Sequence, residues 1–452
     1  MPIRRIRGRV ASLRFRLGFF WGEFNSKTCK FMPLRCSVPV LKTRINWAEH
    51  GELAALFFFQ AMATAMWIVP LSRVLNAHEL SAIQPYAFAA TGLAAFISPL
   101  IFGAMADRHA SPLRVLRGLS VASAISMALA SWSIEYHWPG GMVLVLIQIY
   151  AICAVPTNSI ASAIVFSRLH NSQKQFGPVR ATATIGWMCG CWLISAMNSD
   201  SSPAAGYAGA LVWVVLAAFT FLLPTIDPIP QTGPISLRER MGWDALALLK
   251  NLDHRVVFIT VALFSIPLAA FYPFTPQQLQ QLGFHRTTAW MSLGQVTEII
   301  AMFGLARLLA RWRLKWIFVA GLAVGLLRFG LCALNDRKWL LIGLTLHGFS
   351  FTLFFITAQI YLNERVDPAW RARAQALMGL MNGGVGNLVG YLGTGLWFSA
   401  CSRGVATRWD MFWGGLSVVI GLVLIYFLVA YRGRKRITPD EIERRDVVQT
   451  PI

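Results

Sequence analysis

Charged residues are scarce in this sequence, and acidic ones most of all. Aspartate and glutamate together number 20 in 452 residues, and charged residues make up 13% of the chain. A soluble domain carries about 25% charged and about 45–50% apolar residues, whereas this chain is 56% hydrophobic. The shortage of charge therefore excludes an ordinary soluble protein with a polar surface.

Patterns typical of catalysis and metal binding are also missing. The 7 cysteines are scattered, without the spacing of a zinc site or a disulfide framework. We find no Ser–His constellation and no pair of acids at a predicted membrane surface, as an enzyme site would need. The sequence therefore predicts neither an enzyme nor a cofactor or metal. The alternative from another class of protein is a membrane-embedded enzyme, such as a transferase.

In place of these features the sequence has a series of long apolar runs. A bilayer core about 30 Å thick requires roughly 20 apolar residues per helix. Such runs predict an all-α membrane protein of twelve transmembrane helices. The predicted spans are 51–74, 82–106, 112–133, 141–166, 179–197, 205–224, 255–280, 287–310, 315–333, 339–363, 372–398 and 409–431.

The chain has a net charge of +21. Its Lys and Arg residues are concentrated before the first span, after the last one and in alternate loops. Under the positive-inside rule this distribution places both termini in the cytoplasm. The expected location is a cell (cytoplasmic or inner) membrane. Membrane topology therefore explains the excess of basic residues. The expected partner is the lipid bilayer, and nucleic acid is not expected to bind.

The longest internal polar stretch divides the spans into two sets of six. The predicted parts are a basic cytoplasmic tail (1–46), an N-terminal six-helix half (47–224), a cytoplasmic connector (225–254), a C-terminal six-helix half (255–431) and a cytoplasmic tail (432–452). Two alternatives for the Arg-rich start are a transit peptide and a true start at Met32. Two packed halves around a central site are typical of secondary transporters.

The loop between the second and third predicted spans holds Gly103, then Asp107-Arg108, then more basic residues. This arrangement resembles the signature of the major facilitator superfamily at the same place. A carboxylate there can hold a cation or a helix N-terminus in one state and release it in another. Asp107 and Arg108 are therefore predicted to act as a conformational switch.

Ionisable side chains inside a membrane span are costly, so each one is a candidate functional group. Glu298 is the single acid of its span, and Gln295, three residues earlier, shares its helix face. Together they offer a carboxylate and an amide to paired hydroxyls or a heterocycle. The alternative is a structural pair of Glu298 with Arg328.

Two other spans carry polar residues at helical spacing. Arg180, Thr184 and Trp187 share one face; Arg180 is alternatively a cytoplasmic anchor, and the other two are alternatively packing residues. His347 and Phe351 lie one turn apart, and His347 is either a titrating group or a neutral core imidazole. Further candidates for cavity lining are Gln60, Trp67 and the polar stretch 156–159, whereas the glycines of 382–387 are expected to serve close helix packing.

Several of these motifs together resemble the bacterial nucleoside:proton symporters of the major facilitator superfamily. The matching elements are Arg180-x3-Thr184-Ile185-Gly186-Trp187, Gln295-x2-Glu298, His347-Gly348-x2-Phe351, Gln60-x6-Trp67, Pro156-Thr157 and the stretch from Asp367 to Gln375. The resemblance covers roughly residues 50–430 and implies nucleoside uptake coupled to protons. It implies nucleoside contacts for Arg180, Thr184, Gln295 and Glu298, with ring positions at Trp187, His347 and Phe351.

Two positions depart from the family's pattern. Thr352 stands where the family often has an acid associated with proton coupling, and Ala269 and Tyr272 stand closest to its polar pair in the seventh span. Glu298 and His347 are therefore the predicted proton-coupling residues. The expected partners are a nucleoside and protons, with the chain acting as a monomer. The alternative within transport is a permease or exporter for another small sugar-like or ring-bearing solute.

Overall fold

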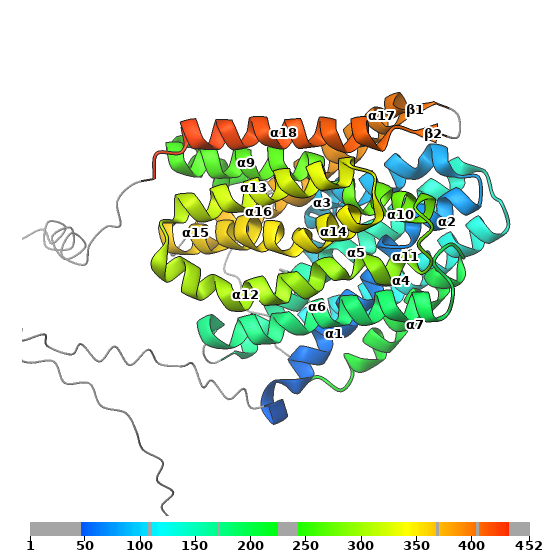
Figure 1. Cartoon of the computed structure of the whole chain (residues 1–452). Coiled ribbons are helices and arrows are strands. Elements are labelled where there is room, and N and C mark those ends of the chain that lie inside the picture. Colours follow the sequence, from blue (N-terminus) through cyan, green and yellow to red (C-terminus); the bar gives the residue numbers. More distant parts are fainter. Residues whose placement is uncertain are drawn as a thin grey trace, which may run out of the picture. The chain divides into compact units, whose positions relative to one another are not determined.

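The structure, a computed structural model, describes residues 47–106, 111–169, 172–224, 243–367, 370–403 and 406–433. The strands in these ranges are two residues each, β1 (Ser402–Arg403) and β2 (Ala406–Thr407), and they pair antiparallel. Helices make up most of the remainder (Figure 1). The prediction of an all-helical fold is confirmed. Asp107, Arg108, the tail 1–46, residues 225–242 of the connector and residues 434–452 lie outside the described residues.

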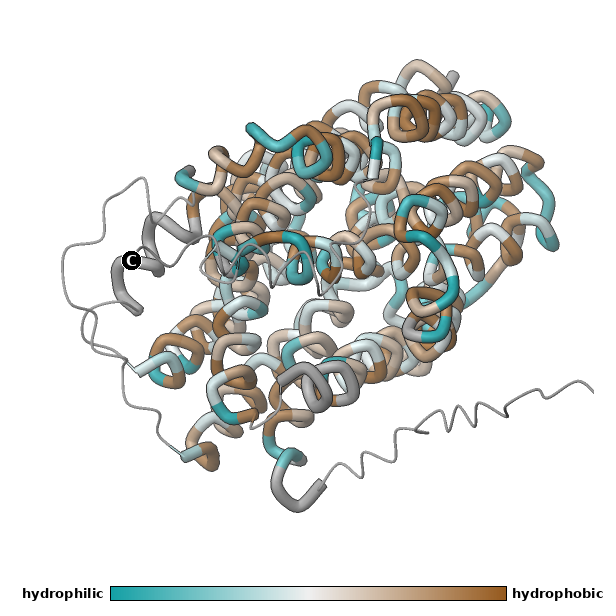
Figure 2. Tube along the Cα trace, turned by 90° about the vertical axis from the view of Figure 1, so that its left-hand side faces the viewer, coloured by the Kyte–Doolittle hydropathy of each residue, from teal (hydrophilic) through white to brown (hydrophobic). Residues whose placement is uncertain are grey.

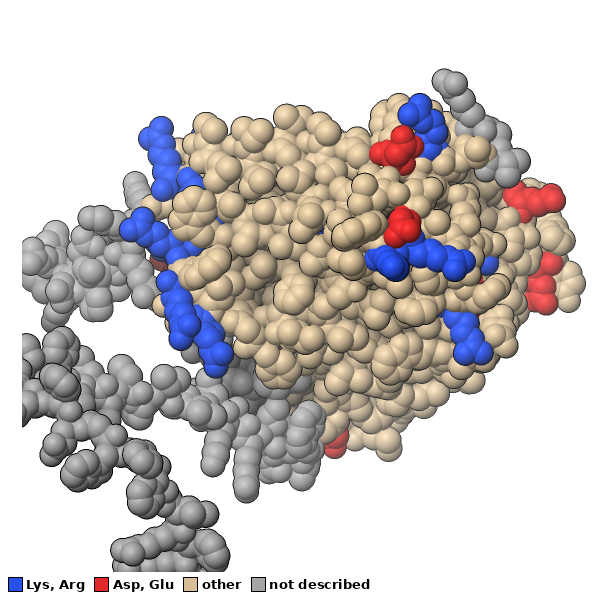
Figure 3. Space-filling model, in the orientation of Figure 1, with Lys and Arg blue, Asp and Glu red and all other residues tan. Residues whose placement is uncertain are grey.

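Eight helical segments of the described chain are long and apolar enough to cross a membrane. They are His50–Ala77, Pro112–Glu135, Gly140–Arg168, Leu252–Gln281, Thr287–Arg311, Leu314–Ala333, Arg337–Arg365 and Trp409–Ala430. Shorter apolar helices, Ser81–Ile97 and Ala204–Phe219, fall in two other predicted spans. On the face drawn in Figure 3, charged side chains lie toward both ends of the helices and leave an uncharged zone between them. Figure 2 shows mostly hydrophobic positions along the helices, as lipid contact requires.

The first seven helices form what we call the N-terminal group. They are α1 (Trp47–Ile68), α2 (Leu71–Ala77), α3 (Gln84–Ala106), α4 (Pro112–Glu135), α5 (Gly140–Arg168), α6 (Ser172–Ala196) and α7 (Ala204–Phe219). Helix α1 packs against α6 and α7, α4 against α5 and α7, and α3 against α5. Gly186 lets α6 approach α1 closely, because a Cβ at this position would overlap the carbonyl group of Phe58.

The remaining helices form the C-terminal group. They are α9 (Leu252–Leu268), α10 (Phe271–Gln281), α11 (Thr287–Met291), α12 (Leu293–Arg311), α13 (Leu314–Ala333), α14 (Arg337–Phe351), α15 (Thr357–Arg365), α16 (Arg371–Gly379), α17 (Asn387–Cys401) and α18 (Trp409–Ala430), preceded by the 3-10 helix η2 (Trp243–Lys250). Helix α13 packs against α14 and α18, and α12 packs against α14. Gly384 and Gly386 lie close to Phe96 and Ser265, so their predicted role in close helix packing is confirmed, whereas a Cβ on Gly383 would meet no atom within 4 Å and the prediction is wrong there.

Two predicted spans are interrupted where proline removes a backbone donor. The span 51–74 breaks before α2, whose N-cap is Pro70. The span 255–280 breaks between α9 and α10, because Pro273 has no N–H to donate to Ala269. Two further spans contain π-helical turns, η3 (Thr352–Ile356) and η5 (Leu380–Gly386). Such turns are frequently found at functional sites.

The two groups meet along three sets of helices. Helix α3 packs against α17 and η5, α2 packs against α10, and α6 packs against α11 and α12. The α3–α17 contact is close, because a Cβ on Gly92 would lie 2.8 Å from the backbone nitrogen of Leu388. Side chains from both groups line the space that these contacts leave between them.

Candidate functional site

A cavity of about 340 Å³ lies between the N-terminal and C-terminal groups. Helices α1, α3, α5 and α6 line it from one group, and α10, α12 and α14 line it from the other. Its polar and aromatic lining residues are Gln60, Thr64, Trp67, Thr91, Tyr150, Asn158, Arg180, Thr184, Trp187, Tyr272, Gln295, Glu298, His347 and Phe351. The structure thus brings all seven predicted substrate-binding residues to one cavity.

Helix α6 contributes Arg180, Thr184 and Trp187 to the cavity wall, on the shared face that their spacing predicts. The guanidinium carbon of Arg180 lies 5.7 Å from the ring centroid of Phe57 on α1. Gly186 holds α6 close to α1, and residues of both helices line the cavity. Arg180 therefore lies in the cavity wall and offers its donors to a bound molecule.

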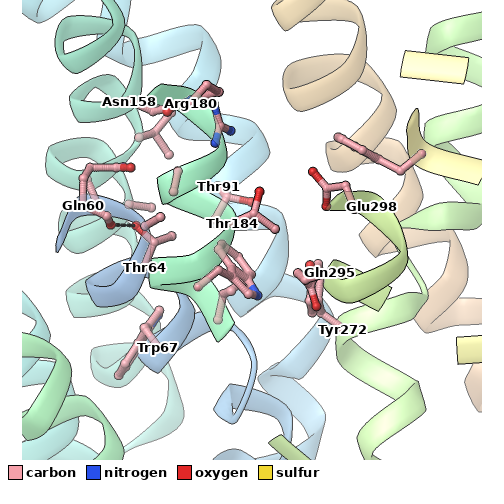
Figure 4. Close-up of a pocket in the computed structure, with 18 of the residues that line it drawn as sticks. Gln60, Thr64, Trp67, Thr91, Asn158, Arg180, Thr184, Tyr272, Gln295 and Glu298 are labelled. Carbon is pink, nitrogen blue, oxygen red and sulfur yellow. Dashed lines mark hydrogen bonds between the residues drawn. The ribbon is translucent and has the colours of Figure 1, made fainter. Parts of the chain in front are cut away.

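Helix α12 contributes Gln295 and Glu298 from the other side. Figure 4 shows Glu298 and Arg180 facing each other across the cavity. No ion pair joins these two side chains, and Glu298 forms none with any other residue in the described ranges. A solute placed between these two groups therefore meets a carboxylate on one side and a guanidinium on the other.

The amide of Gln295 faces backbone carbonyl groups that directly precede its helix, α12. Turned so that its nitrogen faces these groups, the amide donates to the carbonyl oxygens of Met291, at 3.0 Å, and Ser292, at 3.3 Å. In this orientation the nitrogen faces the backbone, so the side-chain oxygen remains as the acceptor. Gln295 can therefore accept a hydrogen bond from a ring N–H or a hydroxyl.

Aromatic rings form much of the remaining wall. Trp187 and Tyr272 come from different groups, and their ring centroids lie 5.8 Å apart. The His347 ring stacks on Phe271 at 4.3 Å and lies 6.2 Å from the ring of Phe351. Rings in offset or tilted contact provide flat apolar surfaces against which a heterocycle can stack.

His347 is buried, with 8% of its surface exposed, and lines the cavity. Its Nδ1 atom has no hydrogen-bond partner among the described residues. The structure therefore does not hold this imidazole by hydrogen bonds on both of its nitrogens. One nitrogen of this ring is left without a protein partner beside the cavity.

The alternative pairing of Glu298 with Arg328 is wrong. The guanidinium of Arg328 lies between Phe271 and Phe329, 4.5 and 4.6 Å from their ring centroids. None of its three nitrogens has a hydrogen-bond partner among the described residues. Cation–π contacts surround this buried charge in place of a carboxylate, so Glu298 is left to the cavity.

Polar residues of α1 and α5 complete the N-terminal wall. Gln60 donates to the hydroxyl of Thr157 at 3.2 Å. Gln60 and Asn158 both line the cavity, as expected for Gln60 and for the stretch 156–159 (Figure 4). Thr64, Thr91 and Tyr150 line the cavity without having been predicted. Thr64 lies one turn from Gln60, so helical spacing was an available signal. The other two are single polar positions among apolar ones, which carry no such signal.

Metal-ligating side chains do not gather in the described part of the chain. Within the described ranges no group of three or more His, Cys, Asp or Glu side chains is placed to hold a metal ion. The predicted switch residues Asp107 and Arg108 lie in the stretch 107–110, which the structure does not describe.

Comparison with known proteins gives a consistent result over most of the chain. Residues 50–436 match the family model of the nucleoside H+ symporters. The putative nucleoside transporter YegT of Escherichia coli K12 is 28% identical over 426 residues, covering 88% of this chain and 98% of that protein. The nucleoside permease NupG of the same strain is 25% identical over 406 residues, covering 83% and 94%. A crystal structure of NupG aligns with a TM-score of 0.75 at 22% identity, covering 86% and 100% of the two chains, and so shares the fold.

Proposed function

The chain belongs to the nucleoside H+ symporter family, and from this premise we propose that it carries nucleosides through the cavity between its two helical groups. It is a multi-pass membrane protein that transports nucleosides together with protons. One observation supports the cavity as the binding site above the others. Seven residues from three separate helices, chosen by spacing and resemblance, all line it.

The architecture that we propose is the major facilitator fold, with twelve spans in two six-helix halves at 47–224 and 255–431. The N-terminal and C-terminal groups each pack mainly within themselves, which supports this division. A substrate site between two such halves suits alternating access, in which the halves rock around the bound solute. Asp107 and Arg108 remain our proposed switch residues in this movement.

The polar groups of the cavity suit both parts of a nucleoside. Glu298 accepts hydrogen bonds from ribose hydroxyls, while Arg180 and Thr184 donate to oxygen or ring nitrogen atoms on the other side. Gln295 accepts from a further donor. Trp187, His347 and Phe351 provide the apolar surfaces against which the base packs. The volume of about 340 Å³ is within the range of small-molecule sites.

Proton coupling is proposed to rest on Glu298, with His347 as the second candidate. Thr352 is fully buried, its hydroxyl has no partner among the described residues, and a threonine side chain does not ionise near neutral pH. The proton therefore requires another site. Glu298 is an ionisable group in the cavity wall and also a proposed ligand of the nucleoside. The proton and the nucleoside are therefore proposed to bind to the same carboxylate.

Uptake of a panel of labelled nucleosides tests the proposed function. Cells that lack their own nucleoside permeases are expected to accumulate at least one labelled nucleoside when they produce this protein. Acidifying the medium is expected to increase the initial rate, because symport draws a proton inward with the solute. Accumulation of a sugar or another ring-bearing solute in place of nucleosides, or net export, would favour the alternative transport functions. Turnover of a lipid-linked substrate without uptake would favour the enzyme alternative.

Both termini and the segment 225–254 are proposed to face the cytoplasm. Reporter domains fused at Gln231 and at the C-terminus are both expected to show cytoplasmic activity, because the basic loops of a membrane protein remain inside. A fusion in the loop between α6 and α7, at Ser201, serves as the control and is expected to report the opposite side. A cytoplasmic signal at Ser201 together with external signals at the other two sites would reverse the topology.

A further inference from the structure

Asp200 is a buried acid at the contact between the two groups. It lies in the loop between α6 and α7 and exposes 8% of its surface. Its Oδ1 atom accepts hydrogen bonds from the backbone N–H of Thr288, at 2.7 Å, and from the hydroxyl of Ser195, at 2.9 Å. The Ser195 oxygen in turn accepts from the backbone N–H of Ala289 at 2.9 Å. Two side chains of the N-terminal group thus hold two backbone N–H groups of α11.

A second link lies on α6, one turn before Ser195. The indole nitrogen of Trp192 donates to the hydroxyl of Ser292 at 2.9 Å. Ser292 directly precedes α12, and its carbonyl oxygen accepts from the amide of Gln295. These bonds connect α6 to the first turn of the helix that carries Gln295 and Glu298.

The hydrogen bonds between described residues of the two groups lie at one end of the helices. Besides the three already given, Gln84 of α3 donates to the carbonyl of Pro273 at 3.0 Å and accepts from Gln277 at 2.9 Å. Helices α2, α10 and α11 lie at this end, on the right in Figure 1. In the proposed topology it is the extracellular end.

A polar hollow of about 410 Å³ borders Asp200 at this end. Arg73, Asn198, Ser201 and Arg286 are among the residues that line it. Breaking a buried hydrogen bond is costly when its groups remain dry, and much less so when water replaces the partner. Because the hollow is polar and Asp200 lines it, water can replace the lost partners of Asp200 and Ser195 when the two groups separate. These hydrogen bonds therefore stabilise the closed end, and water replaces them when this end opens.

We propose that Asp200 and Ser195 are positioning residues that hold the extracellular end of the cavity closed in one state of the transport cycle. This inference rests on the proposed function and adds to it a specific latch, formed by Asp200, Ser195 and the N–H groups of Thr288 and Ala289. Through the adjoining Ser292 the same latch sets the position of Gln295 and Glu298. Closure of the extracellular end therefore also positions Gln295 and Glu298.

Labelling of a cysteine in the cavity, applied from outside, tests the latch. Ile68 lines the cavity and is 9% exposed, so Ile68→Cys reports entry of a membrane-impermeant thiol reagent into intact cells. Adding Asp200→Ala is expected to raise the labelling rate about tenfold or more, since a charge-assisted bond across the closed end is lost. Asp200→Asn keeps an acceptor oxygen and is expected to give a smaller rise. The chain without Ile68→Cys measures the labelling of native cysteines.

Asp336 provides a matched control. Its Oδ1 atom accepts from the N–H groups of Lys338, at 2.9 Å, and Trp339, at 3.3 Å, at the start of α14. It lies at the same end, because the neighbouring Arg337 donates to the carbonyl of Leu282 after α10. The Asp336 bonds stay within the C-terminal group, so Asp336→Ala is expected to leave the labelling rate unchanged.

The proposal is overturned if Asp200→Ala labels at the parent rate, or if Asp336→Ala raises the rate equally. Should Asp200→Ala fail to reach the membrane, Ser195→Ala and Trp192→Phe replace it. Each removes hydrogen bonds of the closed end and is expected to raise labelling several-fold, and parent rates in both would contradict the latch. The readout needs no substrate. A raised rate in a protein that moves no nucleoside would therefore retain the latch and reject the proposed function.

Discussion

Glu298→Gln is expected to abolish concentrative uptake of nucleoside driven by a proton gradient. The carboxylate lines the cavity opposite Arg180 and has no ion-pair partner in the described part of the chain. A glutamine has nearly the same shape but neither binds nor releases a proton. Nucleoside affinity is expected to fall about 10- to 150-fold, since a charge-assisted hydrogen bond contributes about 1.5–3 kcal/mol. Exchange of labelled for unlabelled nucleoside is expected to continue in part, because it needs no net movement of protons.

The measurement is uptake into proteoliposomes against external pH, with and without an imposed proton gradient. For the unchanged protein, uptake is expected to rise as external pH falls, since protons on the outside drive the loaded carrier inward. For Glu298→Gln the profile is expected to be flat. Glu135→Gln is the control, because Glu135 is exposed at the end of α4 and accepts a hydrogen bond from Tyr207 at 2.6 Å. A Glu298→Gln protein with an unchanged pH profile would remove Glu298 as the coupling group and leave His347.

Gly348→Val is expected to eliminate transport and lower stability. Gly348 lies where α14 crosses α12, and a Cβ there would overlap the backbone nitrogen of Glu298 and the carbonyl oxygen of Gly294. The two helices must then separate, which moves His347 and Phe351 away from Gln295 and Glu298. Overpacking of a well-packed interior typically costs about 1–3 kcal/mol and occasionally more. Nucleoside binding is expected to be lost even in protein that reaches the membrane.

Thermal unfolding in detergent and equilibrium nucleoside binding together test this prediction. Gly348→Ala is expected to show the same loss to a smaller degree. The matched control is Gly414→Ala in α18, where a Cβ meets no atom within 4 Å. Alanine is a better helix former than glycine, so this control is expected to keep its activity and not lose stability. Normal binding by a stable Gly348→Val protein would show that the α12–α14 distance does not set the site.

Much of the site was predictable because its residues repeat at helical spacing within single spans. Gln295 and Glu298 are three apart, and Arg180, Thr184 and Trp187 are spaced four and three apart. Such spacing places side chains on one face whatever the helix packs against. Their polarity in an otherwise apolar span then marks that face as the one turned away from lipid. The structure places all five in the cavity.

Interactions between distant residues could not be predicted in this way. A structural pair of Arg328 with Glu298 was the alternative to a binding role for Glu298, yet Arg328 lies between Phe271 and Phe329. The hydrogen bond of Gln60 with Thr157 joins residues 97 apart, and that of Asp200 with Thr288 joins residues 88 apart. No local pattern specifies which of many polar groups meets which.

The sequence by itself determined that this chain is a bundle of membrane helices and which side chains share each helix face. The physical reason is that a spanning segment must satisfy its own backbone hydrogen bonds, so apolar runs of about 20 residues become helices independently of their neighbours. Only the tertiary structure decided which faces meet. Helix packing depends on small residues such as Gly186 and Gly348, whose effect is set by the opposite helix. The cavity and the latch at Asp200 are both products of that packing.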